Sequence, residues 1–363
     1  MLTRDLLQSR ADPDVDRLQR IADPEAFVWR ILPHAARTFT ACITLLPAES
    51  ARAMAVAYLY CRILDTYEDL IPQPVEREAA LAEFSTRFDG PDGEPKPAPR
   101  IDTRYARDPR DRTHVVLVNR CGLVDHVFHT LAPPTRRYIM DLVREMGSGM
   151  IWSSRVFRDQ GGVLRDEQQL SRYCRNVIGL PFLFAVRLLH ERSNGDATVS
   201  EALREDCMLA GEMVQLANVT RDIEKDLRRG VAYHPALRAD LDRSDGEDPG
   251  LRERIRRVRE ELLVRALSLA PAYERMMLAM PFRAVSPARA SGVLMLLFTD
   301  RYYRSCARLA GRPAWPGRRS TAWLILLSVL HVFTPRRSFK TIRVITERWL
   351  RCAAESTVVH LGV

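Results

Sequence analysis

The sequence predicts an all-α protein. Apolar residues recur mostly at helical spacing, and few stretches alternate with a period of two, as half-buried strands do. The chain has 363 residues, of which 46% are hydrophobic, so it can bury a large core. No internal repeat and no change of composition divides it. We therefore expect one helical domain over residues 1–363.

Breaks between the expected helices fall where Gly, Pro and charged residues cluster. The clusters lie at 89–100, 191–200, 242–250 and 311–319. The first is the longest and continues into a charged stretch, DTRYARDPRDR, at 102–112. We expect a flexible surface insertion at 89–112.

The net charge and the cysteine pattern limit the possible classes of function. The net charge is +9, but the densest basic run, at 251–263, alternates in sign at helical spacing, which is typical of a solvated face. We therefore expect no nucleic acid partner, and a phosphate-bearing ligand or an anionic membrane surface fits the charge better. The seven cysteines form no CxxC pair, and the N-terminus has no apolar signal region. This favours a cytoplasmic protein with reduced thiols and no zinc site.

The longest apolar run, AWLILLSVLHVF at 322–333, is too short to span a bilayer core of about 30 Å. We expect it to form a buried core helix. Arg336, Arg337 and Lys340 follow it, so peripheral contact of the C-terminal region with an anionic membrane is the alternative.

Two pairs of aspartates carry the strongest chemical signal. Asp65 and Asp69 are four residues apart, on one face of an expected helix that also presents Tyr58 and Arg62. Taken alone, this pair is compatible with an ordinary solvated helix face, and Arg62 with a simple ion pair to either aspartate.

A second pair, Asp222 and Asp226, has the same spacing and follows another apolar run. Gln215 and Asn218 extend it as a polar stripe beside an apolar one. Two helices that each present two inward carboxylates would make a negative, all-oxygen site, which suits Mg²⁺. Without cations such close like charges are costly. The chemistry expected there is the departure of a diphosphate, whose charge Arg62, Arg221 and Arg228 can help to neutralise.

Five blocks, in order and spacing, resemble the squalene and phytoene synthases. They are ARTFTACITLLP (36–47), AYLYCRILDTYED (57–69), EMGSGM (145–150), YCRNVIGL (173–180) and NVTRDIEKDLRRG (218–230). The resemblance covers most of the chain. It implies a single isoprenoid-synthase domain, in which two aspartate-rich helices line a central apolar cavity and hold two or three Mg²⁺ ions against a prenyl diphosphate.

The resemblance also implies a role for each matching residue. The metal ligands would be Asp65, Asp69, Asp222 and Asp226. The diphosphate contacts would be Arg37, Thr38, Asn218, Arg221 and Arg228. Tyr58 and Arg62 would flank the diphosphates, and Tyr173 would take part in proton removal after the carbon–carbon bond forms. Without the family context, the favoured interpretation of Tyr173 is a core tyrosine with one satisfied hydrogen bond.

The chain departs from the family pattern at several positions. Ala36 stands where serine is common, Asn176 where a bulky aromatic residue is frequent, and Val231 where phytoene-type members carry a basic residue. The continuation of the fourth block, GLPFLF, is also altered. These changes leave the aspartates intact and put the usual second substrate in doubt.

Three functions follow from the resemblance. The first is a prenyltransferase that condenses two prenyl diphosphates head to head. The second transfers a prenyl group to an aromatic acceptor, as the carbazole prenyltransferases of bacterial secondary metabolism do. The third is a non-catalytic assembly factor, which the four retained aspartates disfavour. NADPH is not indicated, because the chain lacks a GxGxxG or Walker-type loop, although squalene synthases use NADPH without one.

Overall fold

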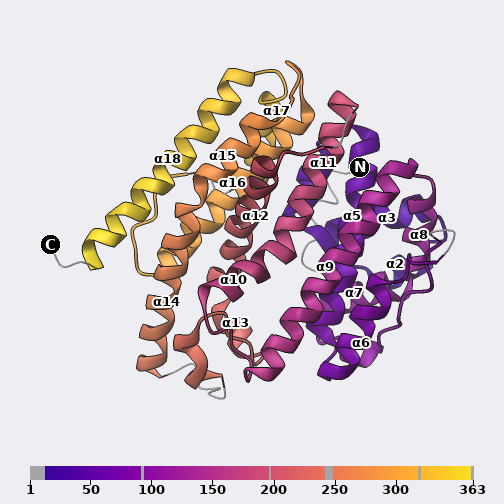
Figure 1. The fold of residues 1–363 in the computed structure, drawn as a ribbon, viewed down its shortest axis with the longest axis horizontal. Helices are drawn as coiled ribbons and strands as arrows, with labels where there is room; N and C mark the ends of the chain where they lie inside the picture. Colours follow the sequence, from indigo (N-terminus) through magenta and orange to yellow (C-terminus); the bar gives the residue numbers. More distant parts are fainter. Residues whose placement is uncertain (1–12, 91–93, 196–197, 242–247, 318–319, 361–363) are drawn as a thin grey trace. The chain divides into compact units, whose positions relative to one another are not determined.

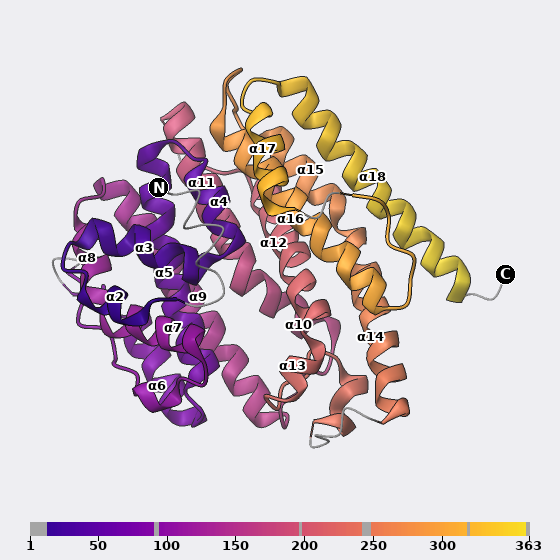
Figure 2. The same ribbon diagram turned by 180° about the vertical axis from the view of Figure 1, so that it is seen from behind.

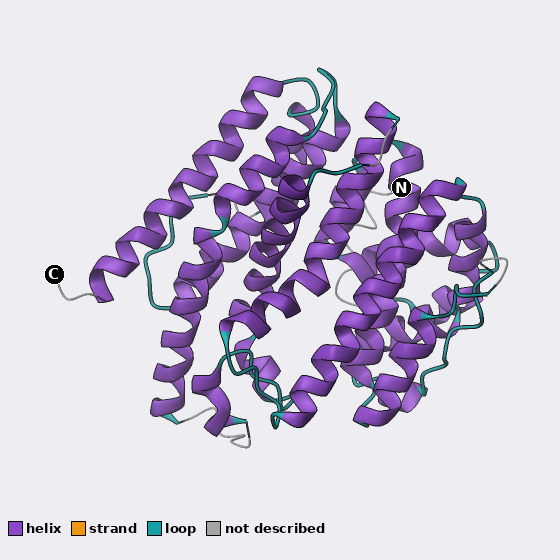
Figure 3. Cartoon of the chain, in the orientation of Figure 1, coloured by secondary structure: helices purple, strands orange, loops and turns teal. Residues whose placement is uncertain are grey.

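The structure is a computed structural model that describes residues 13–90, 94–195, 198–241, 248–317 and 320–360. These residues form helices joined by loops (Figure 3), and the only β pairing among them is an isolated parallel bridge between Val163 and Ala232. The predicted all-α class is therefore confirmed. The chain separates into two compact units, Met1–Arg155 and Val156–Val363.

Helix α5 is the central helix of the first unit (Figure 1), since it contacts α3, α4, α6, α7 and α8. Its neighbours α3 and α7 also contact each other. The elements of this unit are α2 (Val15–Arg20), α3 (Pro24–Ala36), α4 (Thr38–Thr44), α5 (Ala48–Leu70), α6 (Pro74–Ser85), η1 (Thr103–Tyr105), α7 (Pro109–Asn119), α8 (Cys121–His129) and most of α9 (Pro133–Asp159).

Helix α12 has the corresponding place in the second unit (Figure 2), where it contacts α10, η2, α11, α14, α15 and α16. The elements are α10 (Glu167–Cys174), the π-helical turn η2 (Arg175–Gly179), α11 (Leu180–Asn194), α12 (Glu201–Arg221), α13 (Ile223–Leu227), η3 (Pro235–Asp240), α14 (Pro249–Ser268), α15 (Ala270–Ala279), α16 (Pro287–Leu309), α17 (Thr321–Leu330) and α18 (Pro335–His360).

Local sequence explains where many helices begin. Asp108 precedes Pro109 and accepts a hydrogen bond from the Asp111 amide, so it caps α7. Ser200 caps α12 in the same way, through the Leu203 amide. Such caps satisfy amides that have no partner inside the helix, and proline fits the first helical position because it has no N–H.

The middle of α12 closely approaches the π-helical turn η2. A Cβ atom at Gly211 would lie 2.4 Å from Gly179 Cα and 2.5 Å from Gly179 N, so only glycine fits there. Because the contact is between two backbones, a change of side-chain rotamer cannot relieve it. This contact sets the position of α12 relative to η2 and the end of α10.

The described part of the predicted insertion at 89–112 contacts the first unit at several points. The hydroxyl of Tyr67 donates to the Pro99 carbonyl at 2.6 Å, and Arg87 donates to the Lys96 carbonyl at 2.6 and 2.8 Å. Ile101 is buried and exchanges hydrogen bonds with the Asn119 side chain. The mobility of this segment stays a prediction.

The apolar run at 322–333 is not the buried core helix that the sequence predicts. It forms α17 and the turn after it, with Leu324 and Ser328 buried but Leu326 55% and Phe333 66% exposed. Periodicity misled here because a stretch that is apolar on all sides gives no sign of which side lacks a partner. Within the described residues, no helix is both long and apolar enough to cross a membrane.

Candidate active site: two aspartate motifs

The first aspartate motif lies in the last two turns of α5. The Arg62 guanidinium is 3.2 Å from an Asp65 carboxylate oxygen and donates a 2.9 Å hydrogen bond to the Tyr58 hydroxyl. Asp69, one turn further on, is exposed. The predicted stripe of Tyr58, Arg62, Asp65 and Asp69 therefore shares one stretch of helix.

The carboxylates of this motif lie where negative charge is unfavourable. The C-terminal end of a helix carries a partial negative charge, and the last turn of α5 has no basic residue. Burial raises the pKa of Asp65 to about 6; the Arg62 charge opposes this shift, and the Asp69 charge adds to it. Burial, followed by the charges of Asp69 and Asp65, raises the pKa of Glu68 to about 8. A bound cation would relieve this crowding of charge.

Arginines from two further elements act on this motif electrostatically. Burial lowers the pKa of Arg110, at the start of α7, and so do the nearby charges of Arg37 and Arg62. The Asp69 charge acts in the opposite direction. Arg110 is partly buried, and its Nε atom has no hydrogen-bond partner. Three guanidiniums near two aspartates provide the positive charge that a polyanionic ligand needs.

Arg37 also has an unusual backbone. It connects α3 to α4 with φ 50° and ψ −112°, and it is the only non-glycine residue with positive φ among the described residues. Such a conformation costs about 1 to 3 kcal/mol and is concentrated at functional sites. Arg37 is exposed, whereas the adjacent Thr38 is buried.

The second motif does not lie on one continuous helix. Helix α12 ends at Arg221, Asp222 has φ −99° and ψ 15°, and α13 begins at Ile223. The Asp226 amide still donates to the Asp222 carbonyl at 2.9 Å, which keeps the two aspartates one turn apart. The predicted spacing is preserved, but at the junction of two helices.

The polar side chains of this motif are partly paired with one another. Arg221 forms a bidentate ion pair with Asp222, at 2.7 and 2.6 Å, and stacks on the Tyr302 ring at 5.0 Å. The Asn218 side chain donates to that of Gln215 at 3.0 Å. Arg228 is exposed just after α13.

Tyr173 lies in an aromatic cluster. Its hydroxyl is 3.0 Å from that of Tyr233, the two ring centroids are 4.9 Å apart, and Phe157 contacts both rings. Tyr233 is held by the bridge between Val163 and Ala232, where the Leu164 amide donates to the Ala232 carbonyl at 3.0 Å. Tyr173 itself is 6% exposed.

The donor chemistry of the first motif fits a hard divalent cation. Asp65, Glu68 and Asp69 offer only oxygen atoms, which Mg²⁺ prefers. No group of three or more His, Cys, Asp or Glu residues stands in metal-binding geometry within the described ranges. Mg²⁺ usually completes its coordination with water and substrate phosphate oxygens.

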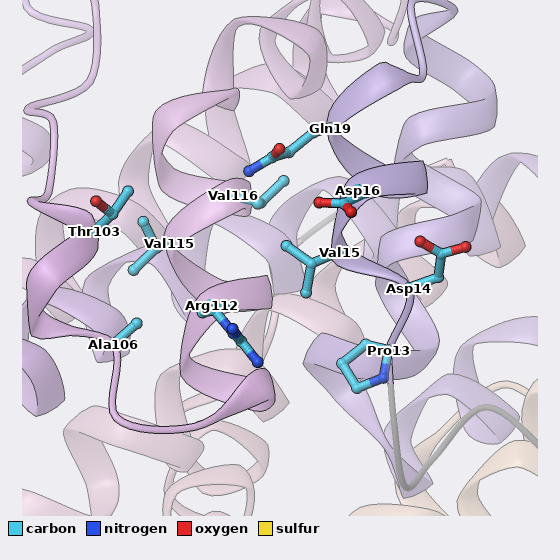
Figure 4. A pocket seen from close by; sticks show the side chains of 10 residues that line it. All are labelled: Pro13, Asp14, Val15, Asp16, Gln19, Thr103, Ala106, Arg112, Val115 and Val116. Carbon is cyan, nitrogen blue, oxygen red and sulfur yellow. The ribbon is translucent and has the colours of Figure 1, made fainter.

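A surface pocket of about 420 Å³ is separate from the first motif. It lies between α2, η1 and α7 and is lined by Pro13, Asp14, Val15, Asp16, Gln19, Thr103, Ala106, Arg112, Val115 and Val116 (Figure 4). None of the residues that the sequence assigns to the site is among them. The shape of this pocket therefore does not connect it with the predicted site.

Three residues of these clusters were missed by the sequence reasoning. Glu68 lies between the two aspartates and accepts a 3.2 Å hydrogen bond from Ser153. Arg110 falls in the predicted insertion, and Tyr233 follows the second motif. A third acidic residue between Asp65 and Asp69 was a visible signal for Glu68. Arg110 and Tyr233 reach their places through tertiary contacts that spacing does not encode.

Comparisons with known proteins identify the family of the chain. The family model "Squalene/phytoene synthase" matches residues 32–319. Human squalene synthase is 28% identical over 207 residues, which are 57% of this chain and 45% of the relative. The chain spans about half the length of the curated relatives it matches.

Solved structures show the same fold. The complex of TcSQS with the ligand BPH1237 has a TM-score of 0.63 at 18% identity and covers 92% of this chain and 99% of that one. A dehydrosqualene synthase in complex with a ligand has a TM-score of 0.55 at 16% identity, with 89% and 99% covered. The all-α isoprenoid-synthase fold and the family match over most of the sequence agree, and the chain belongs to the squalene/phytoene synthase family.

Proposed function

We propose that this protein is a Mg²⁺-dependent prenyltransferase that ionises an allylic prenyl diphosphate and forms a carbon–carbon bond. In this proposal the two units make one isoprenoid-synthase domain, with both aspartate motifs lining a central apolar cavity. The acceptor is a second prenyl diphosphate, which gives a head-to-head product.

The observation that carries the proposal is the shared design of the two motifs. Each unit has a central helix, α5 or α12, and each of these helices leads into an aspartate pair of the same spacing. Each pair also has an arginine in contact with its first aspartate, Arg62 with Asp65 and Arg221 with Asp222. Carboxylates beside arginines suit a ligand that brings both metal ions and phosphate groups.

The residues of the chain have distinct tasks in this reaction. Asp65, Asp69, Asp222 and Asp226 would hold two or three Mg²⁺ ions. When bound, Mg²⁺ neutralises the oxygens of the departing diphosphate. The diphosphate itself would be bound by Arg37, Thr38, Asn218, Arg221 and Arg228, together with Arg110.

Ionisation breaks the carbon–oxygen bond and gives diphosphate and an allylic carbocation. The electron pair of the acceptor double bond then forms the new carbon–carbon bond, and the resulting cation must lose a proton. Tyr58 and Arg62 would orient the diphosphate beside the first motif, supported by their mutual hydrogen bond. Tyr173 would accept or relay the proton, because its hydroxyl lies 3.0 Å from that of Tyr233 and Phe157 packs against both rings. The apolar contacts of this cluster would exclude water, which would otherwise quench the carbocation.

The proposal is tested by incubating the protein with Mg²⁺ and either farnesyl or geranylgeranyl diphosphate as the only substrate. We expect diphosphate release, a product with two joined prenyl groups, and loss of both when EDTA removes the metal. Diphosphate release without a joined product would contradict the head-to-head reaction and direct the search to an aromatic acceptor. No release, in a protein whose melting temperature does not respond to Mg²⁺ with pyrophosphate, would favour a non-catalytic assembly factor.

Peripheral membrane contact and a cytoplasmic location are independent of this chemistry. The proposed membrane contact concerns the surface of the second unit, and neither proposal depends on the aspartates.

A further inference from the structure

Helix α17 presents one continuous apolar face to solvent. Its exposed large side chains are Trp323, Leu326, Val329 and Leu330, and Phe333 continues them in the turn that follows. Their spacing places them on one side of the helix. These five residues are called the α17 face below.

The other side of α17 anchors the helix to the second unit. Leu324 is 3% exposed and Ser328 is fully buried, and the helix packs on α16. The α17 face is therefore the outer side of a fixed helix. Isolated exposed apolar residues are common on protein surfaces, whereas a contiguous group of large ones marks an interaction site.

The edge of the α17 face is basic. Arg336, Arg337 and Lys340 are exposed in the first turns of α18, directly after Phe333. The sequence has no Asp or Glu between Asp300 and Glu347, so no acidic side chain of this stretch offsets their charge. An apolar face with an edge of one sign of charge is complementary to a surface that is apolar inside and anionic outside.

A buried arginine fixes the basic edge relative to the apolar face. Arg289, on α16, is 1% exposed and donates to the carbonyls of His331 and Val332 and to the Ser338 hydroxyl, at 2.9 to 3.3 Å. It also donates to the carbonyls of Arg283 and Ala284, at 2.6 and 2.7 Å. One guanidinium thus joins the end of α17, the start of α18 and the segment before α16. The surface is preorganised, so little ordering is needed when it binds.

We propose that the α17 face and the basic start of α18 form a docking surface for an anionic lipid bilayer. Leu326, Val329, Leu330 and Phe333 would enter the boundary between headgroups and acyl chains, and Trp323 would lie at headgroup level. Arg336, Arg337 and Lys340 would contact lipid phosphates. A second copy of the chain is a poorer fit, because in a two-fold contact the same basic edge appears on both partners.

Co-sedimentation with vesicles tests the proposal on the full chain, at low and at high salt. The vesicles are phosphatidylcholine alone or an equal mixture of phosphatidylcholine and phosphatidylglycerol. We expect binding to the mixed vesicles that weakens with salt, since surface charges are screened within a Debye length. Replacing Arg336, Arg337 and Lys340 together by Gln should weaken it by about fivefold per residue, on the order of a hundredfold in all.

The apolar part is tested by Leu326→Gln combined with Phe333→Gln. We expect at least about a tenfold loss of vesicle affinity, because burying one large apolar side chain contributes enough free energy to change an affinity by about that factor. The matched control is Val75→Gln, which removes an apolar side chain that is 75% exposed on α6 of the first unit and should leave binding unchanged. Equal melting temperatures would show that all variants are folded.

Three results would overturn the proposal. The first is absence of wild-type binding to mixed vesicles at low salt. The second is equal binding to neutral and mixed vesicles that the three Gln substitutions do not reduce. The third is a concentration-dependent dimer in sedimentation that Leu326→Gln dissociates, which would assign the α17 face to a second copy. None of these readouts depends on prenyltransferase activity, so failure here is distinguishable from failure of the proposed reaction.

Discussion

The central helices of the two units, α5 and α12, lead into the same aspartate spacing by different local structures. Helix α5 continues through Asp65 and Asp69, whereas α12 ends before Asp222 and a short second helix carries Asp226. The first motif adds Glu68 and crowds three carboxylates at a helix C-terminus. In the second motif the ion pair between Arg221 and Asp222 is bidentate, and a turn after Asp226 leads to Tyr233. The same sequence spacing can therefore be produced by a rigid helix or by a junction.

The largest expected effect comes from removing one carboxylate from each motif. We expect Asp65→Asn and Asp222→Asn each to reduce the rate of diphosphate release by about a hundredfold to a thousandfold, the usual cost of losing one electrostatic contact to the transition state. Release from farnesyl diphosphate at saturating Mg²⁺ measures both.

The comparison between the two variants is informative because their partners differ. Asp65→Asn leaves Arg62 with its bond to Tyr58, whereas Asp222→Asn leaves Arg221 with its stacking on Tyr302. Asp16→Asn, at an exposed position on α2, is the control for loss of one negative charge. If only one motif proved sensitive, the two would not act in a common site.

The next effect separates proton transfer from ionisation. Tyr173→Phe removes the hydroxyl that contacts Tyr233 but keeps the ring contacts with Phe157. We expect the joined product to form about a hundredfold more slowly, as is typical for loss of a general acid or base, while diphosphate release persists. Product mass and phosphate release, followed in the same reaction, measure the two steps.

Tyr58→Phe makes the converse change in the first unit. It removes the hydroxyl that accepts from Arg62, so we expect release and product to fall together. An equal fall of both in Tyr173→Phe would instead assign that residue a positioning role.

A stability comparison tests how firmly each central region is fixed. Gly211→Ala brings a Cβ atom against the backbone of Gly179, and we expect a loss of about 3 kcal/mol in the free energy of unfolding. Gly147→Ala, on α9, meets the Ser85 side chain, with its Oγ atom at 1.7 Å. The hydroxyl can rotate away, but the Ser85 Cβ atom, at 2.8 Å, cannot, so we expect about 2 kcal/mol there.

Urea unfolding measures both glycine variants. Ser85→Ala should recover part of the loss in the Gly147 variant, because it removes the Oγ atom but leaves the Cβ atom in place. A Gly211 variant as stable as the wild type would show that α12 can move away from η2.

The sequence predicted the α5 motif well because a continuous helix preserves the periodicity from which it was recognised. It also located the second pair, but not the break at Asp222, since the apolar stripe of Val219, Ile223 and Leu227 runs through the break without a signal. Arg110 was hidden in a segment whose composition indicated a loop. Helix α17 was assigned to the core, because hydrophobicity measures the tendency to be buried and does not tell whether a partner belongs to the same chain.

The smallest expected effect concerns the positive charge that distinguishes the first motif. Arg110 and Arg112 are two residues apart on α7 and therefore face different sides of the helix. Arg110 interacts with the charges of Asp69 and Arg62, whereas Arg112 lines the separate pocket in Figure 4. We expect Arg110→Gln to raise the KM for the prenyl diphosphate by about tenfold, the equivalent of one charged hydrogen bond, with a smaller change in kcat. Arg112→Gln should leave both constants unchanged, although it removes the same charge from the same helix. Equal effects of the two substitutions would mean that α7 supplies only a general positive field, and Arg110 would then lose its place among the diphosphate contacts.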